Sequence, residues 1–395
     1  MKKLGWIPLS CIALWLGLLP SMGGLRQADR PFQPQWRSLA ELLVERMSLR
    51  AGERVLLLGQ PGRFGELTSE LRSAVRLAGA TDLGALSVLS QPYPHADGSD
   101  LLSKAAQANQ QEIQELLDGA FDIAVMLPGA QRAHPAYRAI QELLREGKGR
   151  TIHFHWEGAY SLDGRVMPIT DAISADYQRA LLETDYATLS AAQKIFEKAV
   201  RRNSIRVTTP GGTDIRFQVG RRPVTRQDGD ASASRAALAR NLIDREIELP
   251  CGAVRVAPLE ESVEGVIAFP ASVWNGRTVE GLRMRFRKGK VVEINASTGK
   301  EAVEAELDRA GLEGRSFREF ALGFNPLLAV PEENPWIPYY GYGAGVVRLS
   351  LGDNSELGGQ VGGGYVRWNF FADATVRVGK KVWVKDGRLS LPSEN

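Results

Sequence analysis

Three residues near the end of a predicted strand have the types and spacing of metal ligands. His153, His155 and Glu157 alternate along a strand that begins with RTIHFHW, so their side chains point to one face. Imidazole and carboxylate groups on one face could hold a divalent metal that activates water. The alternative is a strand end whose polar side chains are solvated or capped. We favour this alternative, because no further ligand can be located from the sequence.

Histidine is otherwise scarce. All four histidines of the 395-residue chain lie within its first 155 residues, and the rest of the sequence has none. Imidazole is the side chain most used to hold catalytic zinc. No serine-centred G-x-S-x-G motif is present, and Cys251 has no histidine near it in sequence. We therefore expect Cys251 to be a small buried residue and not a nucleophile.

The composition is that of a soluble globular protein large enough for two domains. Hydrophobic residues make up 44% of the 395 residues, and charged residues make up 24%. The formal net charge is +3, and no block of lysine and arginine with interleaved aromatic residues occurs. These features argue against a nucleic-acid partner.

The first 23 residues have the layout of a secretory signal peptide. Lys2 and Lys3 form a basic start, residues 7–19 are mostly apolar, and Ser-Met-Gly at residues 21–23 is a plausible cleavage point. We expect export to the periplasm or the exterior. The alternative is a membrane anchor through residues 5–23, because the apolar run is nearly long enough to span a bilayer.

The positioning elements fall into two domains. After a polar linker at residues 24–35, residues 36–190 alternate between amphipathic helices and apolar strands such as RVLLLG and FDIAVML. This alternation predicts an α/β domain whose parallel sheet has helices on both faces. Two predicted helices are long, one over residues 100–120 and one from about residue 176 to 202.

The remaining residues, 191–395, predict a different architecture. Short runs rich in Val, Ile, Phe and Arg are separated by glycines, and a single helix, GKEAVEAELDRAG, interrupts them. This pattern is typical of an antiparallel, strand-rich α+β domain. The sequence places the domain boundary between residues 185 and 200.

Five segments of this second domain occur in a distinctive order. They are IRVTTPGGTDIRF at 205–217, LPCGAVRVAPLEESVEGVIAF at 249–269, REFALGFNP at 318–326, GVVRLSLG at 345–352 and YVRWNFF at 365–371. In this order they resemble the thermophilic metalloaminopeptidase family, which includes aminopeptidases T and S. At fold level the resemblance extends over about residues 36–390. It implies two divalent metals, zinc or cobalt, that activate water, and it implies a homodimer.

The resemblance also implies that most of the family's site residues are replaced here. Of the residues that align with that site, only one, Glu319, is retained. The replacements are Ala253 for a glutamate, Arg348 and Arg367 for histidines, Asn369 for an aspartate and Ser355 for the catalytic tyrosine.

These replacements argue against metal-dependent hydrolysis. Alanine donates no lone pair, arginine stays protonated, and one carboxylate cannot hold two metals. Glu319 would then need a partner, and Arg348 or Arg367 could supply it. The arginines either fill a dead site with ion pairs or form a basic pocket for an anion, such as a carboxylate. If some of the nearby aromatic residues line that pocket, they would favour an apolar or aromatic ligand beside an anion. These residues are Trp336, Tyr339, Tyr340, Tyr342, Trp368, Phe370 and Phe371.

We therefore expect an exported, non-hydrolytic homologue without a cofactor that binds a small anionic ligand, a peptide or a protein partner. The alternative is an active metal-dependent aminopeptidase or hydrolase. Such an enzyme could use a site rebuilt from His153, His155 and Glu157 around zinc or cobalt.

Overall fold

The computed structural model describes residues 31–60, 62, 64–88 and 100–391. The predicted signal peptide at residues 1–23 and most of the linker at 24–35 lie outside these ranges. Within the described ranges, no helix is both long and apolar enough to cross a membrane.

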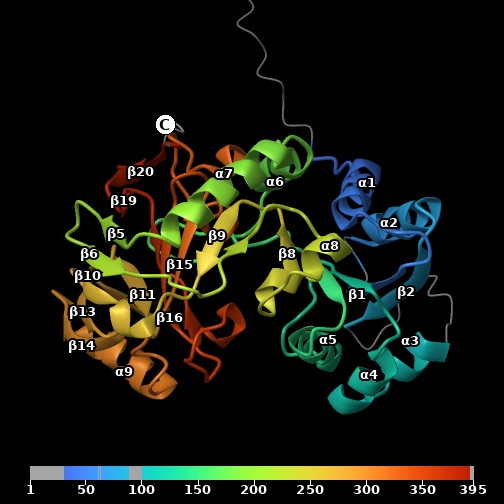
Figure 1. Ribbon diagram of the computed structural model, residues 1–395, viewed down its shortest axis with the longest axis horizontal. Helices are drawn as coiled ribbons and strands as arrows, with labels where there is room; N and C mark the ends of the chain where they lie inside the picture. The colour runs from blue at the N-terminus through green and yellow to red at the C-terminus, as the bar shows by residue number, and fades with distance from the viewer. Residues whose placement is uncertain (1–30, 61, 63, 89–99, 392–395) are drawn as a thin grey trace, which may run out of the picture.

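The N-terminal half is built on a parallel five-stranded sheet in the order β2-β1-β3-β4-β8, which confirms the predicted fold class (Figure 1). Leu57 and Val125 share a core with α1 and α2, whereas Leu56 and Met126 share a second core with α4 and α5. Helices therefore cover both faces, as alternating side chains in buried strands require. The strands are β1 (Arg54–Gly59), β2 (Thr81–Ser87), β3 (Ile123–Met126), β4 (Arg150–Phe154) and β8 (Glu246–Leu249), and the helices are α1 (Trp36–Met47), α2 (Gly65–Leu77), α3 (Asp100–Ala105), α4 (Gln110–Leu117) and α5 (Pro135–Arg145).

The two long predicted helices are each broken in two. The expected helix over residues 100–120 is α3 and α4, and the expected helix over about 176–202 is α6 (Asp171–Leu182) and α7 (Tyr186–Val200). Asn109 accepts hydrogen bonds from the first-turn amides of α4, and Asp185 caps α7 in the same way. Short Asx side chains satisfy the free amides of a new helix start, so they end the preceding helix and begin another.

The C-terminal half contains two main antiparallel sheets. One has eight strands in the order β14-β13-β10-β6-β5-β19-β20-β21, and the other has six, with β17-β16-β15-β9-β7 in line and β18 beside β16. This arrangement confirms the strand-rich expectation. The bounds are β5 (Ile205–Thr208), β6 (Asp214–Phe217), β7 (Thr225–Arg226), β9 (Ala253–Val256), β10 (Glu264–Ala268), β11 (Ser272–Trp274), β12 (Arg277–Val279), β13 (Arg283–Arg287), β14 (Lys290–Asn295), β15 (Phe317–Gly323), β16 (Val347–Gly352), β17 (Val366–Arg367), β18 (Phe370–Phe371), β19 (Thr375–Val378), β20 (Lys381–Lys385) and β21 (Arg388–Leu389), with helices α8 (Ala233–Ala236) and α9 (Lys300–Ala310).

Aromatic side chains join these two sheets. The Phe217 ring of β6 lies 5.5 Å from Phe317 and 5.4 Å from Phe320, both on β15. Phe196 of α7 packs against Trp383 of β20 with centroids 4.9 Å apart. All five side chains are buried. This packing anchors the six-stranded sheet by one face and leaves the other face free to carry polar groups.

The chain returns to the first sheet well after the predicted boundary at residue 190. Strand β8 pairs in parallel with β4, with His153 opposite Glu248. Three residues, 250–252, then connect β8 directly to β9 of the six-stranded sheet. The boundary therefore does not separate the two sheets completely, because β8 contributes to the first sheet from within the second half.

Gln227 joins the two sheets. Its backbone N–H donates to Ala253 O at 2.8 Å, and its carbonyl accepts from Gly252 N at 2.9 Å. Its buried side chain donates from Nε2 to Glu246 O at 2.9 Å and accepts from Glu248 N at 2.8 Å. The amide thus pairs with the open edge of β8 as a neighbouring strand would.

We expect Gln227→Leu to lower the free energy of unfolding by about 2–4 kcal/mol, because it leaves one carbonyl and one amide of β8 without partners. Urea denaturation would measure the change. The matched control is Gln218→Leu, since the Gln218 side chain is exposed. Equal stability of the two variants would show that Gln227 does not stabilise the junction.

Candidate functional site

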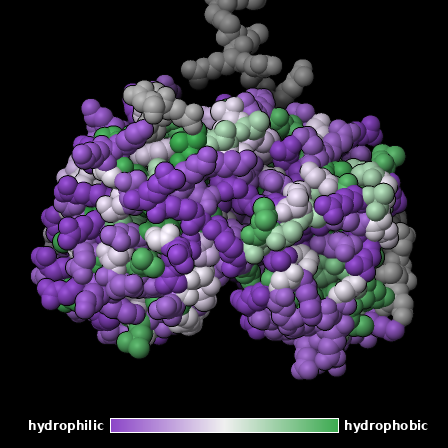
Figure 2. All heavy atoms as spheres, in the orientation of Figure 1, coloured by the Kyte–Doolittle hydropathy of each residue, from purple (hydrophilic) through white to green (hydrophobic). Residues whose placement is uncertain are grey.

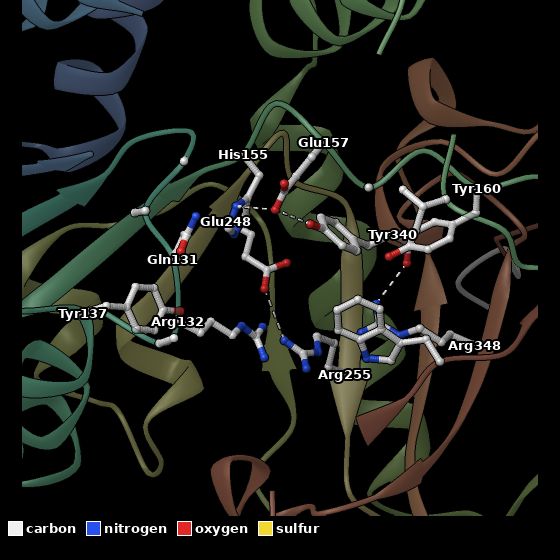
Figure 3. Close-up of a pocket in the computed structure, with 16 residues that line it drawn as sticks. Gln131, Arg132, Tyr137, His155, Glu157, Tyr160, Glu248, Arg255, Tyr340 and Arg348 are labelled. Atoms are coloured by element: carbon white, nitrogen blue, oxygen red, sulfur yellow. Dashed lines mark hydrogen bonds and ion pairs between the residues drawn. The ribbon is translucent and has the colours of Figure 1, made fainter. Parts of the chain in front are cut away.

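A cavity of about 680 Å³ lies between the two halves and is open on one side (Figure 3). Figure 2 shows the groove that separates the two lobes at the lower edge of the molecule. The N-terminal half contributes the loop after β3, at residues 129–133, and the residues that follow β4, including His155 and Glu157. The C-terminal half contributes Arg255 from β9 and Arg348 from β16. We call this space the cleft cavity.

Three neighbouring strands place charged groups toward this cavity. Arg255 on β9 and Arg348 on β16 are both directly opposite Ala321 of β15. Glu319 lies two residues before Ala321, so it shares their face of the sheet. The opposite face carries apolar residues of the core. Period-two alternation therefore separates a charged cleft face from an apolar core face.

Glu319 is fully buried and held by arginines. Arg348 donates from Nε to Glu319 Oε1 at 2.7 Å, and its Nη2 lies 2.5 Å from the same oxygen. Arg255 Nη2 donates to Oε2 at 3.0 Å. Arg318 Nε is 3.7 Å from Oε2, because a bulge between residues 317 and 319 turns its side chain toward this cluster. Both carboxylate oxygens are therefore engaged by cations.

The arginines also determine the charge of Glu319. Burial by itself would raise the pKa of this carboxyl group, because it disfavours the ionised form. The guanidinium groups of Arg255, Arg348 and Arg318 outweigh burial and hold the pKa well below its usual range. Glu319 is therefore a carboxylate at neutral pH, and its lone pairs are directed at cations.

Only one of the two arginines expected beside Glu319 is there. Arg367 instead donates from Nη1 to Glu306 Oε1 at 2.8 Å and lies 3.4 Å over the ring of Trp274. Asn369 donates to the backbone carbonyl of Leu349 at 3.0 Å. Of the two arginines named as alternatives, Arg348 pairs with Glu319 and Arg367 does not, since the Arg367 side chain is directed at α9 and β11.

The other two replaced positions also do not contribute polar groups to the cavity. Ala253 is fully buried in the hydrophobic core and pairs with Gly323 across the strands. Ser355 bonds through Oγ to Asp353 at 2.6 Å and does not line the cavity. Its neighbour Glu356 is the residue that reaches the cluster, where it contacts Arg318 and Arg255.

These residues do not fit two divalent metals. A metal pair needs several converging lone-pair donors without bound protons. Here the only carboxylate among the family positions is saturated by guanidinium groups, and the adjacent side chains are cations. Among the residues with described structure, no three His, Cys, Asp or Glu side chains are grouped so that they could hold a metal ion.

The structure brings the other predicted ligands near one another but gives them separate partners. The His153 and His155 rings are 5.4 Å apart, edge to face. His153 Nε2 lies 3.0 Å from Glu246 Oε1. Glu157 accepts a hydrogen bond from Tyr340 and is 3.8 Å from His155 Nδ1. Burial, and then the neighbouring His153, lower the pKa of His155 to about 4, so His155 is neutral at pH 7.

Tyr340 forms an aromatic wall of the cleft cavity and has a strained backbone. Its φ is 53° and that of Tyr339 is 37°, values that large side chains rarely adopt. Tyr340 N donates to Gly158 O at 2.8 Å, and its carbonyl accepts from Arg348 Nη1 at 3.0 Å. Gly158, at φ 83°, leaves room for the ring, since a Cβ there would lie 2.4 Å from it. These contacts hold the ring in place despite the strain.

Sequence reasoning missed three charged residues of the cavity. Arg255 lies two positions after Ala253, so period-two alternation could have placed it on the same face. Glu248 lies on β8, and the sequence pattern did not assign this strand to the first sheet. Arg132 lies in a loop and had no recognisable sequence signal. Of the seven aromatic residues considered as lining, Tyr340 and Trp368 line the cavity and the other five do not.

Comparison with known proteins finds a partial family match and two similar folds. Residues 183–326 match the sequence model of the thermophilic metalloprotease family, M29. No curated protein matches the chain. Among solved structures, 2,5-dihydroxypyridine dioxygenase from Pseudomonas putida KT2440 aligns with a TM-score of 0.62 and 15% identity, over 91% of this chain and 97% of that one.

Wild-type AmpT from Thermus thermophilus aligns with a TM-score of 0.56 and 18% identity, over 90% of this chain and 98% of that one. At identities this low, the two alignments show only that the two-domain fold is shared. The matched segment at residues 183–326 includes three of the five ordered segments that carry the resemblance. The match over residues 183–326 and the shared fold therefore support the thermophilic metalloprotease family for this chain.

Proposed function

We propose that this protein is a non-hydrolytic homologue of the thermophilic aminopeptidases, whose cleft binds a small anionic ligand. The observation that carries the proposal is the buried Glu319, whose two oxygens face Arg348 and Arg255. The guanidinium groups supply the positive charge that metals would supply in the family. They cannot activate water as a bound metal does, because they have no open coordination position.

The fold alone does not specify peptide hydrolysis. The dioxygenase from Pseudomonas putida shares the fold over nearly its whole length, and its name indicates a different reaction. Function in this architecture therefore depends on the residues of the cleft. In this chain those residues are arginines, glutamates and aromatic rings around a cavity of about 680 Å³, a size suited to a small molecule.

We also propose that the protein is exported. The support is the layout of residues 1–23, a basic start followed by an apolar run and a plausible cleavage point. Expression in a Gram-negative host should give a periplasmic protein whose intact mass lacks the first 23 residues. Recovery of the full-length mass from the membrane fraction would indicate the anchor instead.

The absence of hydrolysis can be tested directly. We expect protein incubated with zinc, cobalt or manganese to retain no stoichiometric metal by elemental analysis and to release no chromophore from aminoacyl-nitroanilide substrates. We expect no metal to bind because arginines, which repel divalent cations, stand where the family has metal ligands. Metal-dependent turnover that is lost in Glu319→Gln would overturn the proposal. One bound metal, lost in His153→Ala, would favour the rebuilt hydrolase.

The ion cluster predicts a pH-dependent loss of stability. We expect Glu319→Gln to lower the free energy of unfolding at pH 7 by about 3–5 kcal/mol, because it leaves buried guanidinium groups without their counterion. The pKa of Glu319 is depressed in the fold, so its stabilisation is complete above the unfolded value near 4.3 and is lost as the pH falls toward the folded value. The difference between wild type and variant should therefore shrink below about pH 4.

Denaturant titrations at pH 7 and at pH 3 would measure this difference. The matched control is Glu293→Gln, whose ion pair with Arg285 is half exposed and should contribute little to stability. A Glu319→Gln variant as stable as wild type at pH 7 would contradict the counterion role.

A further inference from the structure

A second, smaller cavity adjoins the cleft cavity. Its volume is about 270 Å³, and the two cavities share four lining residues: Arg132, Tyr137, Glu248 and Arg255. These four residues lie where the two spaces adjoin, a region that we call the neck. Arg132 comes from the N-terminal half and Arg255 from the C-terminal half, so the neck is built from both lobes.

Arg255 is neutralised by carboxylates. Its Nη1 lies 3.4 Å from Glu248 Oε1, and its Nη2 lies 3.0 Å from Glu319 and 3.3 Å from Glu356. It is only 3% exposed. Glu248 also accepts a hydrogen bond from the Tyr342 hydroxyl. The C-terminal side of the neck is therefore a closed network with little capacity for another strong partner.

Arg132 differs from the other arginines of the cavity. It makes no hydrogen bond or ion pair with any residue whose structure is described. Figure 3 shows its guanidinium extended toward Arg255 across the opening. The nearby carboxylates act on it only at longer range, through Glu356, Glu246 and Glu248. Two guanidinium groups that face each other without an intervening anion repel.

The ion pairs around the neck indicate the ligand's charge. The carboxylates of Glu248, Glu319 and Glu356 pair with Arg255, Arg318 and Arg348. Glu246 lies beside His153 and Gln141. Among the described residues, Arg132 is therefore the arginine of the neck that has no ion-pair partner. A monoanion would pair with this one guanidinium, whereas a dianion would bring a second negative charge close to these carboxylates.

The walls of the cleft cavity specify the body of the ligand. Tyr160, Tyr340 and Trp368 line it, and the rings of Tyr340 and Trp368 pack edge to face with centroids 5.2 Å apart. The Trp368 Nε1 atom is buried and has no hydrogen-bond partner among the described residues. Aromatic walls favour a flat aromatic ligand.

We propose that the neck binds the carboxylate of a small aromatic acid, with Arg132 as its principal cation and the ring against Tyr160, Tyr340 and Trp368. The assignment rests on the proposed function, because it takes the cleft as a ligand site and not a metal centre. The Arg132 fork can donate two parallel hydrogen bonds to a carboxylate. The bound carboxylate would pair with Arg132 on the side of the neck that faces Arg255.

Isothermal titration of the full mature chain with benzoate and 4-hydroxybenzoate would test this assignment. We expect binding by wild type and at least about tenfold weaker binding by Arg132→Gln, because a charge-assisted pair is lost. Arg132→Lys should recover part of the affinity. Arg138→Gln is the matched control, since Arg138 lines only the smaller cavity. Benzyl alcohol, which has no charge, should bind more weakly than benzoate.

Three results would overturn the assignment: no binding of either acid at millimolar concentration, equal affinity in wild type and Arg132→Gln, or a preference for phenyl phosphate over benzoate. Melting curves would verify that Arg132→Gln is folded, which we expect because the residue is exposed on a loop. Metal-dependent peptide hydrolysis would instead refute the proposed function, whatever the result with benzoate, so the two failures are distinguishable.

Discussion

The buried charge of Glu319 is the constraint on which the rest of the cleft depends. A carboxylate with no exposed surface is costly unless cations satisfy both oxygens. Arg348 and Arg255 do so from the strands on either side of β15. Once these guanidinium groups are buried they need further partners: Glu248 and Glu356 contact Arg255, and the Tyr340 carbonyl accepts from Arg348. The cluster therefore extends outward from one residue until it reaches the cavity wall.

This network also joins the two halves. Glu248 lies near the end of β8 in the parallel sheet, and Arg255 lies seven residues later on β9 of the antiparallel sheet. The short connection brings a carboxylate of one lobe against a guanidinium of the other. Gln227 strengthens the same junction by bonding to both sheets. The position of the cleft is therefore determined by covalent continuity and by buried hydrogen bonds together.

The same geometry explains why the cavity can be charged without being unstable. One face of the six-stranded sheet packs its phenylalanines against the eight-stranded sheet, and the opposite face carries the arginines. The strained turn at Tyr340 is held between Gly158 and Arg348. Apolar packing on one side thus supports a polar surface on the other, as strand alternation allows.

Sequence patterns predicted the architecture more completely than they predicted the site. Alternating apolar strands and amphipathic helices identified the parallel sheet, and short glycine-separated runs identified the antiparallel sheets. The breaks at Asn109 and Asp185 were missed, because an Asx cap competes with a helix that periodicity alone would continue. Strand β8 was missed as a member of the first sheet, because pairing with β4 spans nearly a hundred residues of sequence.

The sequence by itself determined which donors are present: Glu319 is retained, and arginines, an alanine and an asparagine replace the other family ligands. These identities limit the chemistry, because arginine keeps its proton wherever it lies. Only the tertiary structure decided which of them meet. Arg348 contacts Glu319, Arg367 contacts Glu306, and Arg132 crosses from the other lobe without a partner among the described residues. Side-chain types are local properties of the chain, whereas their convergence depends on strand register and long-range packing.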